Sequence, residues 1–510
     1  MTKNNCFEKR NDTRWNGVYT FRKGIFLPLK GMVMNTERIS DPIRTLQQTT
    51  ETLSETILEG GDERLHLLSN GLNKYNVNPV QFQGILNRGS CTCSPFTPDG
   101  YAVALDLLRD ITPATFPKFH HEHTQRLKEL LNFEGEDRFD VFFAPSGSDL
   151  CYYPLLFSQM INPGKKIVNL VTCPEELGSG STLAMNGQYY FQTNQIGKTF
   201  EKGAHLTKTL DISRKDFPAR GDMGRIINHQ ANILETIQEL GPDYSIIANL
   251  VIGSKSGIEN NTRVISQVPE SVMWTVDLCQ FRASRLLVNG LLGQNCMVLI
   301  TGSKFYQAPP FCGALLVPRT ITNRFKYVDP DLLAPFHDIF TKYDFPVELR
   351  DKFVGFPEKQ NVGLMLRWEA ALNEMEKFDN LCSFEVHSTC SDWNDFVRGE
   401  IKDSPQLELM PDQELTSPTI ISFRVKNRRG EYLSYEQLRD LYQTICSTEH
   451  EGFSNATKVL FGQPVRYGEK SFIRLAIGSH NIRQFVEQDV SFEDDRRIVE
   501  IINEFARDYR

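Results

Sequence analysis

The middle of the chain alternates short apolar runs with segments of helical periodicity. Helical spacing of apolar residues, three to four apart, covers Asp149–Ile161 and Gly224–Leu240. Runs that are apolar on both faces are typical of strands in a sheet that helices cover. These strands are expected at 138–145, 165–173, 244–253, 272–279, 296–302 and 313–318. The pattern predicts a large α/β domain.

The two ends of the chain are organised differently. Residues 1 to about 60 are polar, with one helix-like stretch at Asp41–Leu58, and residues 70–94 are rich in Asn, Gly, Ser and Pro, which is typical of ordered loops. Beyond about 335, helix and strand signals alternate again at Gly363–Phe378, Thr419–Val425, Ser434–Ser447 and Phe472–Ile477. We expect an N-terminal arm with loops (1–95), a large domain (96–335) and a smaller α+β domain (336–510).

Composition excludes several classes of function. The 510 residues carry 56 Lys and Arg against 64 Asp and Glu, a formal charge of −8, and a polyanion-binding protein needs a surplus of Lys and Arg instead. No apolar run approaches the length of a membrane span, and the first thirty residues have no apolar core of a secretory signal. The eleven cysteines are scattered, which favours free thiols over a disulfide framework. We expect a cytoplasmic protein without nucleic-acid or membrane partners.

Two groups of residues could bind a metal by their type. Cys91 and Cys93 have no second cysteine pair at zinc-like spacing. His120, His121 and His123 have no neighbouring residue that completes a tetrahedral site, and the start of a surface helix explains them as well. No metal is predicted.

Three features of the α/β region suit one chemistry. Ala144–Asp149 (APSGSD) runs from a strand end through Gly147 into a helix, where backbone N–H groups and the helix dipole favour an anion. Asp277 is a single acid at the end of the strand VMWTVDLC, where an acid needs a positive partner. Lys304 follows the strand CMVLITG directly. Taken singly, these features are equally explained by a helix cap, a structural salt bridge and a lysine that reaches solvent.

Taken together, the three features describe a site for pyridoxal phosphate. This cofactor needs a cup for its phosphate, a carboxylate that keeps its pyridine nitrogen protonated, and a lysine that forms an imine with it.

The stretch from Ser256 to Pro318 resembles the fold-type I pyridoxal phosphate enzymes, in the branch of class V aminotransferases and cysteine desulfurases. That branch carries a Ser-Gly turn, Asp-x-x-Gln or Asp-x-x-His, then Ser/Thr-x-x-Lys-Phe/Tyr and Gly-Ala-Leu. This chain has SGI at 256–258, DLCQ at 277–280, TGSKFY at 301–306 and GALLV at 313–317, in the same order. The resemblance implies a large, mainly parallel sheet with helices on both faces, plus a smaller α+β domain, in a homodimer.

Carried over by position, the resemblance assigns roles to individual residues. Lys304 would form the imine and later move the α proton of the substrate, while Asp277 would pair with the ring nitrogen and Gln280 with the ring hydroxyl. The phosphate would be held by Gly147, Ser148, Thr301 and Ser303. Asp149 beside a phosphate is unfavourable, so its side chain is expected to point away and to serve the start of the helix.

Further assignments rest on position alone. Where the branch often has a ring over the cofactor, this chain has Cys173–Gly180 without an aromatic residue, so Ser179 is the candidate there. Arg474, in FIRLAIG, resembles the arginine that binds the substrate α-carboxylate; a surface arginine is the alternative. Arg367 is a second candidate, for which a structural ion pair is the simpler explanation. Asn73–Tyr75 and Ser90–Ser94 are candidates for closing over the substrate, with Asn73 as a substrate-binding residue, or for a dimer interface.

The cofactor motifs do not select the reaction. A cysteine desulfurase needs a mobile nucleophilic cysteine on a late loop, and Cys382, Cys390 and Cys446 do not resemble one. We expect a transferase that acts on an amino acid or a related amine, with aminotransferase as the first hypothesis. A lyase, a decarboxylase or a β-elimination or replacement enzyme, and an epimerase, remain open. A scaffold that has lost catalysis is a remote alternative, because both the lysine and the acid are present.

Overall fold

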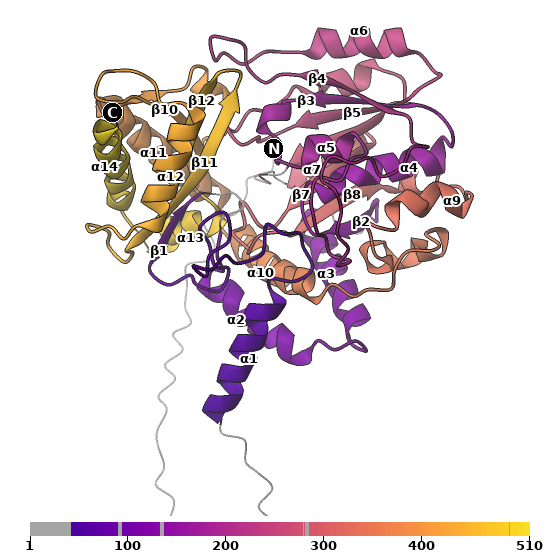
Figure 1. Ribbon diagram of the computed structural model, residues 1–510, viewed down its shortest axis with the longest axis horizontal. Coiled ribbons are helices and arrows are strands. Elements are labelled where there is room, and N and C mark those ends of the chain that lie inside the picture. Colours follow the sequence, from indigo (N-terminus) through magenta and orange to yellow (C-terminus); the bar gives the residue numbers. More distant parts are fainter. Residues whose placement is uncertain are drawn as a thin grey trace, which may run out of the picture.

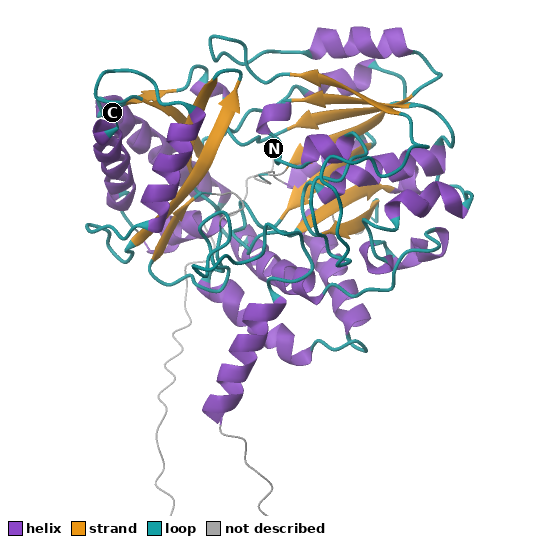
Figure 2. Cartoon of the chain, in the orientation of Figure 1, coloured by secondary structure: helices purple, strands orange, loops and turns teal. Residues whose placement is uncertain are grey.

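The computed structural model describes residues 42–89, 94–132, 137–278, 280, 285–488 and 490–509 (Figure 1). Two sheets lie in two lobes, side by side, and Figure 2 shows their strands with helices packed around each. Cys91, Cys93 and Ser90 lie outside the described residues.

The large sheet has seven strands in the order β2-β8-β7-β6-β5-β3-β4. Six of them run in one direction, and β8 is antiparallel to both of its neighbours. Their bounds are Phe139–Ala144 (β2), Ile167–Thr172 (β3), Ile212–Phe217 (β4), Ser245–Val251 (β5), Met273–Leu278 (β6), Cys296–Thr301 (β7) and Gly313–Pro318 (β8). The six apolar strands expected from the sequence are confirmed.

Alternation along each strand divides the interior into two cores, one on each face of the sheet. In β2, Val141 and Phe143 belong to one buried cluster and Phe142 to the other. Both faces are covered by helices, as an apolar parallel sheet requires. The helices of this lobe are α2 Pro98–Asp110, α3 Phe116–Leu131, α4 Tyr153–Ile161, α5 Ser181–Met185, α6 Gln230–Leu240, α7 Arg285–Gly293, α8 Arg319–Thr322 and α9 Pro330–Leu333.

The smaller sheet has five strands in the order β1-β11-β12-β10-β9. Strand β1, from the N-terminal part of the chain, pairs in parallel with β11, and the remaining pairs are antiparallel. The strands are β1 Ile85–Arg88, β9 Leu407–Leu409, β10 Ile420–Val425, β11 Lys458–Tyr467 and β12 Lys470–Ala476. The helices around it are α11 Ser383–Asp403, α12 Tyr435–Ser447, α13 Ser479–Gln488 and α14 Glu493–Asp508. The predicted mixture of helix and strand after 335 is confirmed.

Two long helices lie at the base of the molecule in Figure 1: α1 (Pro42–Thr56) and α10 (Val362–Asp379). Helix α10 packs against α2, α3 and α13, so it connects the two lobes through one apolar core.

Two predicted helices differ in detail from the structure. Asp149–Ile161 begins with a 3-10 turn (Asp149–Tyr152) before α4. The helix expected from Gly224 begins only at Gln230, because residues 220–226 form a tight turn in which Arg220 and Ile226 make an isolated β-bridge.

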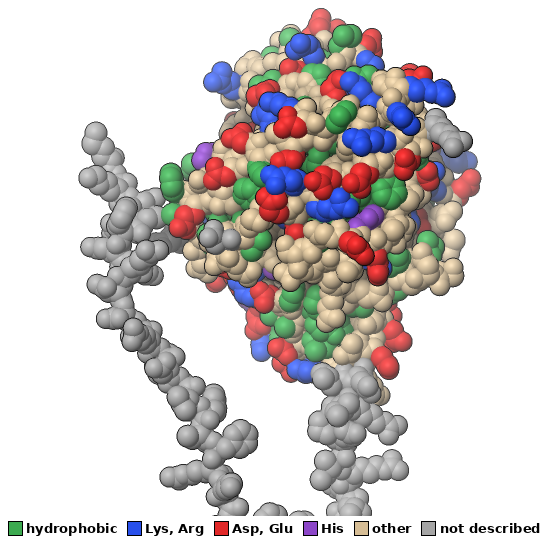
Figure 3. Space-filling view, turned by 90° about the vertical axis from the view of Figure 1, so that its left-hand side faces the viewer, with side chains coloured by type: hydrophobic (Ala, Val, Ile, Leu, Met, Phe, Trp, Pro, Cys, Tyr) green, Lys and Arg blue, Asp and Glu red, His purple; other side chains and the backbone are tan. Residues whose placement is uncertain are grey.

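The surface of the small-lobe side mixes acidic and basic side chains (Figure 3). On α14, Arg496 pairs with Glu400 and Glu493, and Arg497 pairs with Glu500. Among the described residues, no helix is long and apolar enough to span a bilayer.

Candidate active site

A cavity of about 350 Å³ lies where the carboxyl ends of the large-sheet strands face the small lobe. Of the predicted site residues, nine line it: Gly147, Ser148, Ser179, Asp277, Gln280, Thr301, Ser303, Lys304 and Arg474. Residues separated by more than 300 positions in the sequence therefore meet around one space.

Strand register explains how the central residues meet. Asp277 of β6 stands beside Leu299 of β7, so the acid and the Thr301–Lys304 segment leave the same edge of the sheet. Gly313 of β8 lies between Ala144 of β2 and Thr301 of β7. A Cβ on Gly313 would lie 3.0 Å from the carbonyl carbon and oxygen of Ser146, so only glycine lets the 145–148 turn cross β8 here.

The 145–148 turn forms a small polar cup. A Cβ on Gly147 would lie 3.3 Å from Cγ2 of Thr301, and a Cβ on Gly178 would lie 3.0 Å from Oγ of Ser148. The hydroxyls of Ser148 and Ser181 are 3.2 Å apart and both line the cavity. Glycines and hydroxyls thus leave room and donors for an anion at the end of β2.

Asp149 does not line the cavity. Its carboxylate accepts hydrogen bonds from the backbone N–H and the hydroxyl of Ser146, at 2.9 and 2.8 Å, and it opens the 3-10 turn before α4. Burial and the nearby Asp62 carboxylate raise the pKa of Asp149 to about 6. Asp149 therefore stabilises the 145–148 turn on the side away from the cavity.

A buried cation supports the same turn. Arg64 lines the cavity, forms a two-pronged ion pair with Asp62, and lies between the rings of Tyr190 and Phe311. Burial disfavours its charge, but Asp62 outweighs this effect and raises the pKa of Arg64 further. Arg64 also lies 3.4 Å from the Ser146 hydroxyl. Arg64 was not predicted from the sequence, because its place at the cavity depends on how segments distant in the chain pack together.

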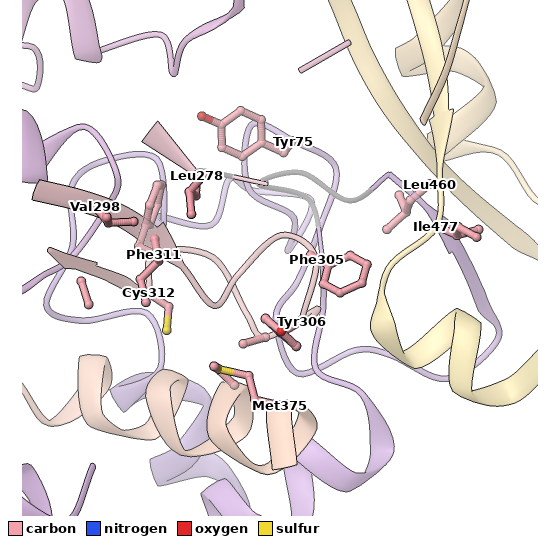
Figure 4. Close-up of a cluster of buried hydrophobic side chains, with 14 of the residues drawn as sticks. Tyr75, Leu278, Val298, Phe305, Tyr306, Phe311, Cys312, Met375, Leu460 and Ile477 are labelled. Atoms are coloured by element: carbon pink, nitrogen blue, oxygen red, sulfur yellow. The ribbon is translucent and has the colours of Figure 1, made fainter. Parts of the chain in front are cut away.

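The lysine is followed by two buried aromatic residues that anchor its segment to the small lobe. Phe305 and Tyr306 are buried in the apolar cluster of Figure 4, together with Met375 of α10 and Ile477 of the small lobe. Both the N–H and the hydroxyl of Ser479 donate to the Phe305 carbonyl, at 2.8 and 3.1 Å. These contacts anchor the backbone next to Lys304, which lines the cavity.

A second buried acid joins two of the loops at the cavity. Glu176, after β3, accepts hydrogen bonds from the hydroxyl and the N–H of Ser256, after β5, and from the Ser254 hydroxyl. Arg220 lies 3.6 Å from the same carboxylate, and both side chains are 1% exposed. The Ser-Gly turn at 256 thus anchors the 173–180 loop, which brings Ser179 to the cavity without an aromatic residue.

Arg474 of β12 is a buried cation at the small-lobe wall. It is 2% exposed, and its Nη1 donates to the Gln463 carbonyl at 2.7 Å. A Cβ on Gly462 would overlap Cγ of Arg474, so glycine in β11 makes room for this side chain. Within the described part of the chain, Arg474 has no acidic partner.

Asn73 does not line the cavity. It is buried, and its amide oxygen accepts from the N–H groups of Tyr75 and Val77, at 2.9 and 3.3 Å. It shapes the loop that carries Lys74 and Tyr75, and these two residues do line the cavity. Asn73 therefore supports the wall and does not contact the space itself.

Arg367 has a different role from the ion pair that we expected. It is fully buried and donates to four backbone carbonyls, those of Phe311, Ile57, Glu59 and Gly60. Burial lowers the pKa of Arg367 to about 10. It closes the carboxyl end of α1, where carbonyls lack helix partners and the dipole favours a cation.

The histidines of α3 are part of the packing. His123 lies 2.7 Å from a Glu369 oxygen, and burial lowers the pKa of His120 to about 3. In the described ranges, no three His, Cys, Asp or Glu side chains gather as metal ligands would.

No family model matches the chain, and no curated protein matches it. Solved structures do. A NifS-like protein from Rickettsia africae is 10% identical, over 82% of this chain and 98% of that one, with a TM-score of 0.51. TDC from Oryza sativa, solved with pyridoxal phosphate, is 10% identical over 93% and 99%, with a TM-score of 0.51. This chain has the fold of the type I pyridoxal phosphate-dependent transferases. The predicted fold class is confirmed.

One wall of the cavity, formed by helix α12, was not predicted from the sequence. Helix α12 contributes Tyr435, Arg439, Tyr442 and Gln443 to the cavity. They recur at helical spacing and had a periodicity signal, but only the packing of the small lobe shows that this face is turned toward the cavity.

Proposed function

We propose that this chain binds pyridoxal phosphate and catalyses a reaction at the α carbon of an amino acid or a related amine. The observation that carries this proposal is that Lys304, Asp277 and the 145–148 turn share one cavity in a type I fold. When bound, the cofactor withdraws electrons from the bond that breaks at the α carbon.

Each residue has a task that its chemistry suits. Asp277 holds a proton on the ring nitrogen, and Gln280 offers an amide to the ring hydroxyl. Gly147, Ser148, Thr301 and Ser303 offer hydrogen bonds to the phosphate. Lys304 holds the cofactor and moves a proton at the α carbon, because its amine reaches the same space.

Arg474 places transamination, like other reactions that keep the α-carboxylate, ahead of decarboxylation. A buried guanidinium that binds the α-carboxylate stabilises it as an anion and so opposes its loss as neutral carbon dioxide. This favours reactions that keep the carboxylate over decarboxylation. None of the described cysteines lines the cavity, which does not support sulfur transfer by a cysteine at this site.

The reaction is tested by adding single amino acids to the cofactor-loaded protein and following its visible absorption. Transamination predicts that the absorption bleaches to that of pyridoxamine phosphate and that a 2-oxo acid appears in equal amount. Release of carbon dioxide, or of a β substituent with ammonia, would contradict transamination and assign the protein to a lyase.

We also propose that the protein is a homodimer, on the resemblance alone, and that it is cytoplasmic, on its composition and scattered cysteines. Light scattering should give about twice the chain mass of 58.4 kDa. A mass of one chain at micromolar concentration would contradict the dimer.

A further inference from the structure

The walls of the cavity carry more cations than acids. Its described lining includes one acid, Asp277, and the cations Arg64, Lys74, Lys255, Lys304, Arg439 and Arg474. Asp62 offsets Arg64, Lys304 serves the cofactor and Arg474 serves one carboxylate. This excess lies in a chain with a net charge of −8, so it is local to the cavity.

Two of the remaining cations lie at the exposed rim, on segments that touch each other. Lys74 belongs to the N-terminal loop and Arg439 to α12. The hydroxyl of Tyr442 donates to the backbone carbonyl of Tyr75 at 3.4 Å. Tyr442 lies one helical turn after Arg439, and Tyr75 follows Lys74, so this contact joins the two segments that carry the cations.

Neither cation is neutralised within the described part of the chain. Lys74 and Arg439 make no ion pair there. The two acids nearest to Arg439 on α12 are engaged elsewhere: Glu436 binds Arg466 and Asp440 binds the Tyr509 hydroxyl. Burial and the nearby Arg64 guanidinium lower the pKa of Lys74, so an anion placed beside it would relieve an unfavourable charge.

We infer that Lys74 and Arg439 bind a second anionic group on the substrate, away from the α-carboxylate at Arg474. The substrate is then an amino acid whose side chain ends in a carboxylate or a phosphate-type group. This inference rests on the proposed function for the role of Arg474, and it names the substrate class that the same site accepts. The small, partly aromatic cavity excludes a polymeric anion.

Three probes test this without any reaction, because none carries an amine. Butyrate has one carboxylate, glutarate has two, and 3-phosphonopropionate has a carboxylate and a phosphonate. Calorimetric titration of the cofactor-loaded protein should show that one of the two dianionic probes binds at least about tenfold more tightly than butyrate. Whichever binds more tightly identifies the second group as carboxylate or phosphate-type.

Variants locate the effect. Arg439→Gln and Lys74→Gln should each weaken the preferred dianionic probe about tenfold and leave butyrate within about twofold. Arg474→Gln should weaken all three probes. Arg109→Gln is the matched control, since this exposed arginine pairs with Asp106 and does not line the cavity. It should change nothing.

Equal binding of all three probes by the wild type would overturn the inference, as would an unchanged preference in both Arg439→Gln and Lys74→Gln. The proposed function fails separately, if the protein takes up no pyridoxal phosphate. The probes are then titrated into the protein as purified, and the Arg439→Gln and Lys74→Gln variants distinguish binding at these two cations from binding at the 145–148 turn.

Discussion

Single residues at this site are positioned by partners outside it. Asp149 is the clearest case: the sequence suggested an acid beside an anion, and the structure places it behind the turn with Ser146. The prediction that its side chain points away is confirmed. Its ionisation is costly because burial and Asp62 both act against the charge.

This cost predicts a pH dependence of stability. The pKa of Asp149 in the folded protein, about 6, lies above its ordinary value of 3.8. The folded chain therefore binds the proton more tightly than the unfolded chain, and the free energy of unfolding should fall as pH rises from about 4 to 7, by up to about 3 kcal/mol from this group.

Asp149→Asn keeps an oxygen that can accept from Ser146 and removes the titration. Urea unfolding at several pH values should show that the variant gains stability relative to wild type as pH rises through about 6. Parallel pH curves for the two proteins would contradict the assigned cause.

Among the elements, the apolar pattern predicted the fully buried strands and missed an exposed strand and two helices. The six apolar strands were predicted because all of their residues are buried. Strand β4 (ISRKDF) was missed because it is an edge strand with exposed polar side chains. Helices α11 and α14 were missed although α14 has a buried apolar stripe, at Ile498, Ile502 and Ala506.

Arg367 shows how one side chain holds an element. Arg367→Met would leave buried carbonyls at the end of α1 without donors, so we expect a loss of about 3 kcal/mol or more in the free energy of unfolding, and faster hydrogen exchange in α1. Arg109→Met is the control, because this exposed arginine of α2 pairs only with exposed Asp106. It should cost less than about 1 kcal/mol. Similar losses in both variants would argue against the anchor.

At the scale of the whole molecule, the site exists only because the two lobes meet. The motifs at 256–258, 277–280, 301–306 and 313–317 gave the large-lobe half of the cavity. The α12 face and Arg64 were not predicted as wall residues, because their place depends on how distant segments pack. The Asn73–Tyr75 loop was a candidate for closing over the substrate, and its Lys74 and Tyr75 line the cavity. Arg474 was predicted from motif order and does lie at the cavity.

The contact between the lobes makes a prediction about cofactor affinity. A Cβ on Gly478 would lie 2.6 Å from the Phe305 carbonyl oxygen, next to Lys304, so Gly478→Ala must shift that segment. We expect pyridoxal phosphate to dissociate about tenfold more readily, measured by dialysis and absorption. Gly399→Ala in α11 has open space around it and should leave cofactor binding unchanged. Unchanged affinity in Gly478→Ala would show that the lobe contact does not position the lysine.

The central claim is that Lys304 holds pyridoxal phosphate, and it is tested by covalent capture. The purified protein is loaded with the cofactor and reduced with borohydride, which fixes the cofactor to the lysine that carries it, and the modified peptide is identified by mass spectrometry. Lys304→Ala and Lys255→Ala are treated in parallel, because both lysines line the cavity. We expect modification at Lys304 in the wild type and in Lys255→Ala, and loss of the visible absorption in Lys304→Ala. Specific modification of Lys255 instead, or no uptake of cofactor by the wild type, would contradict it.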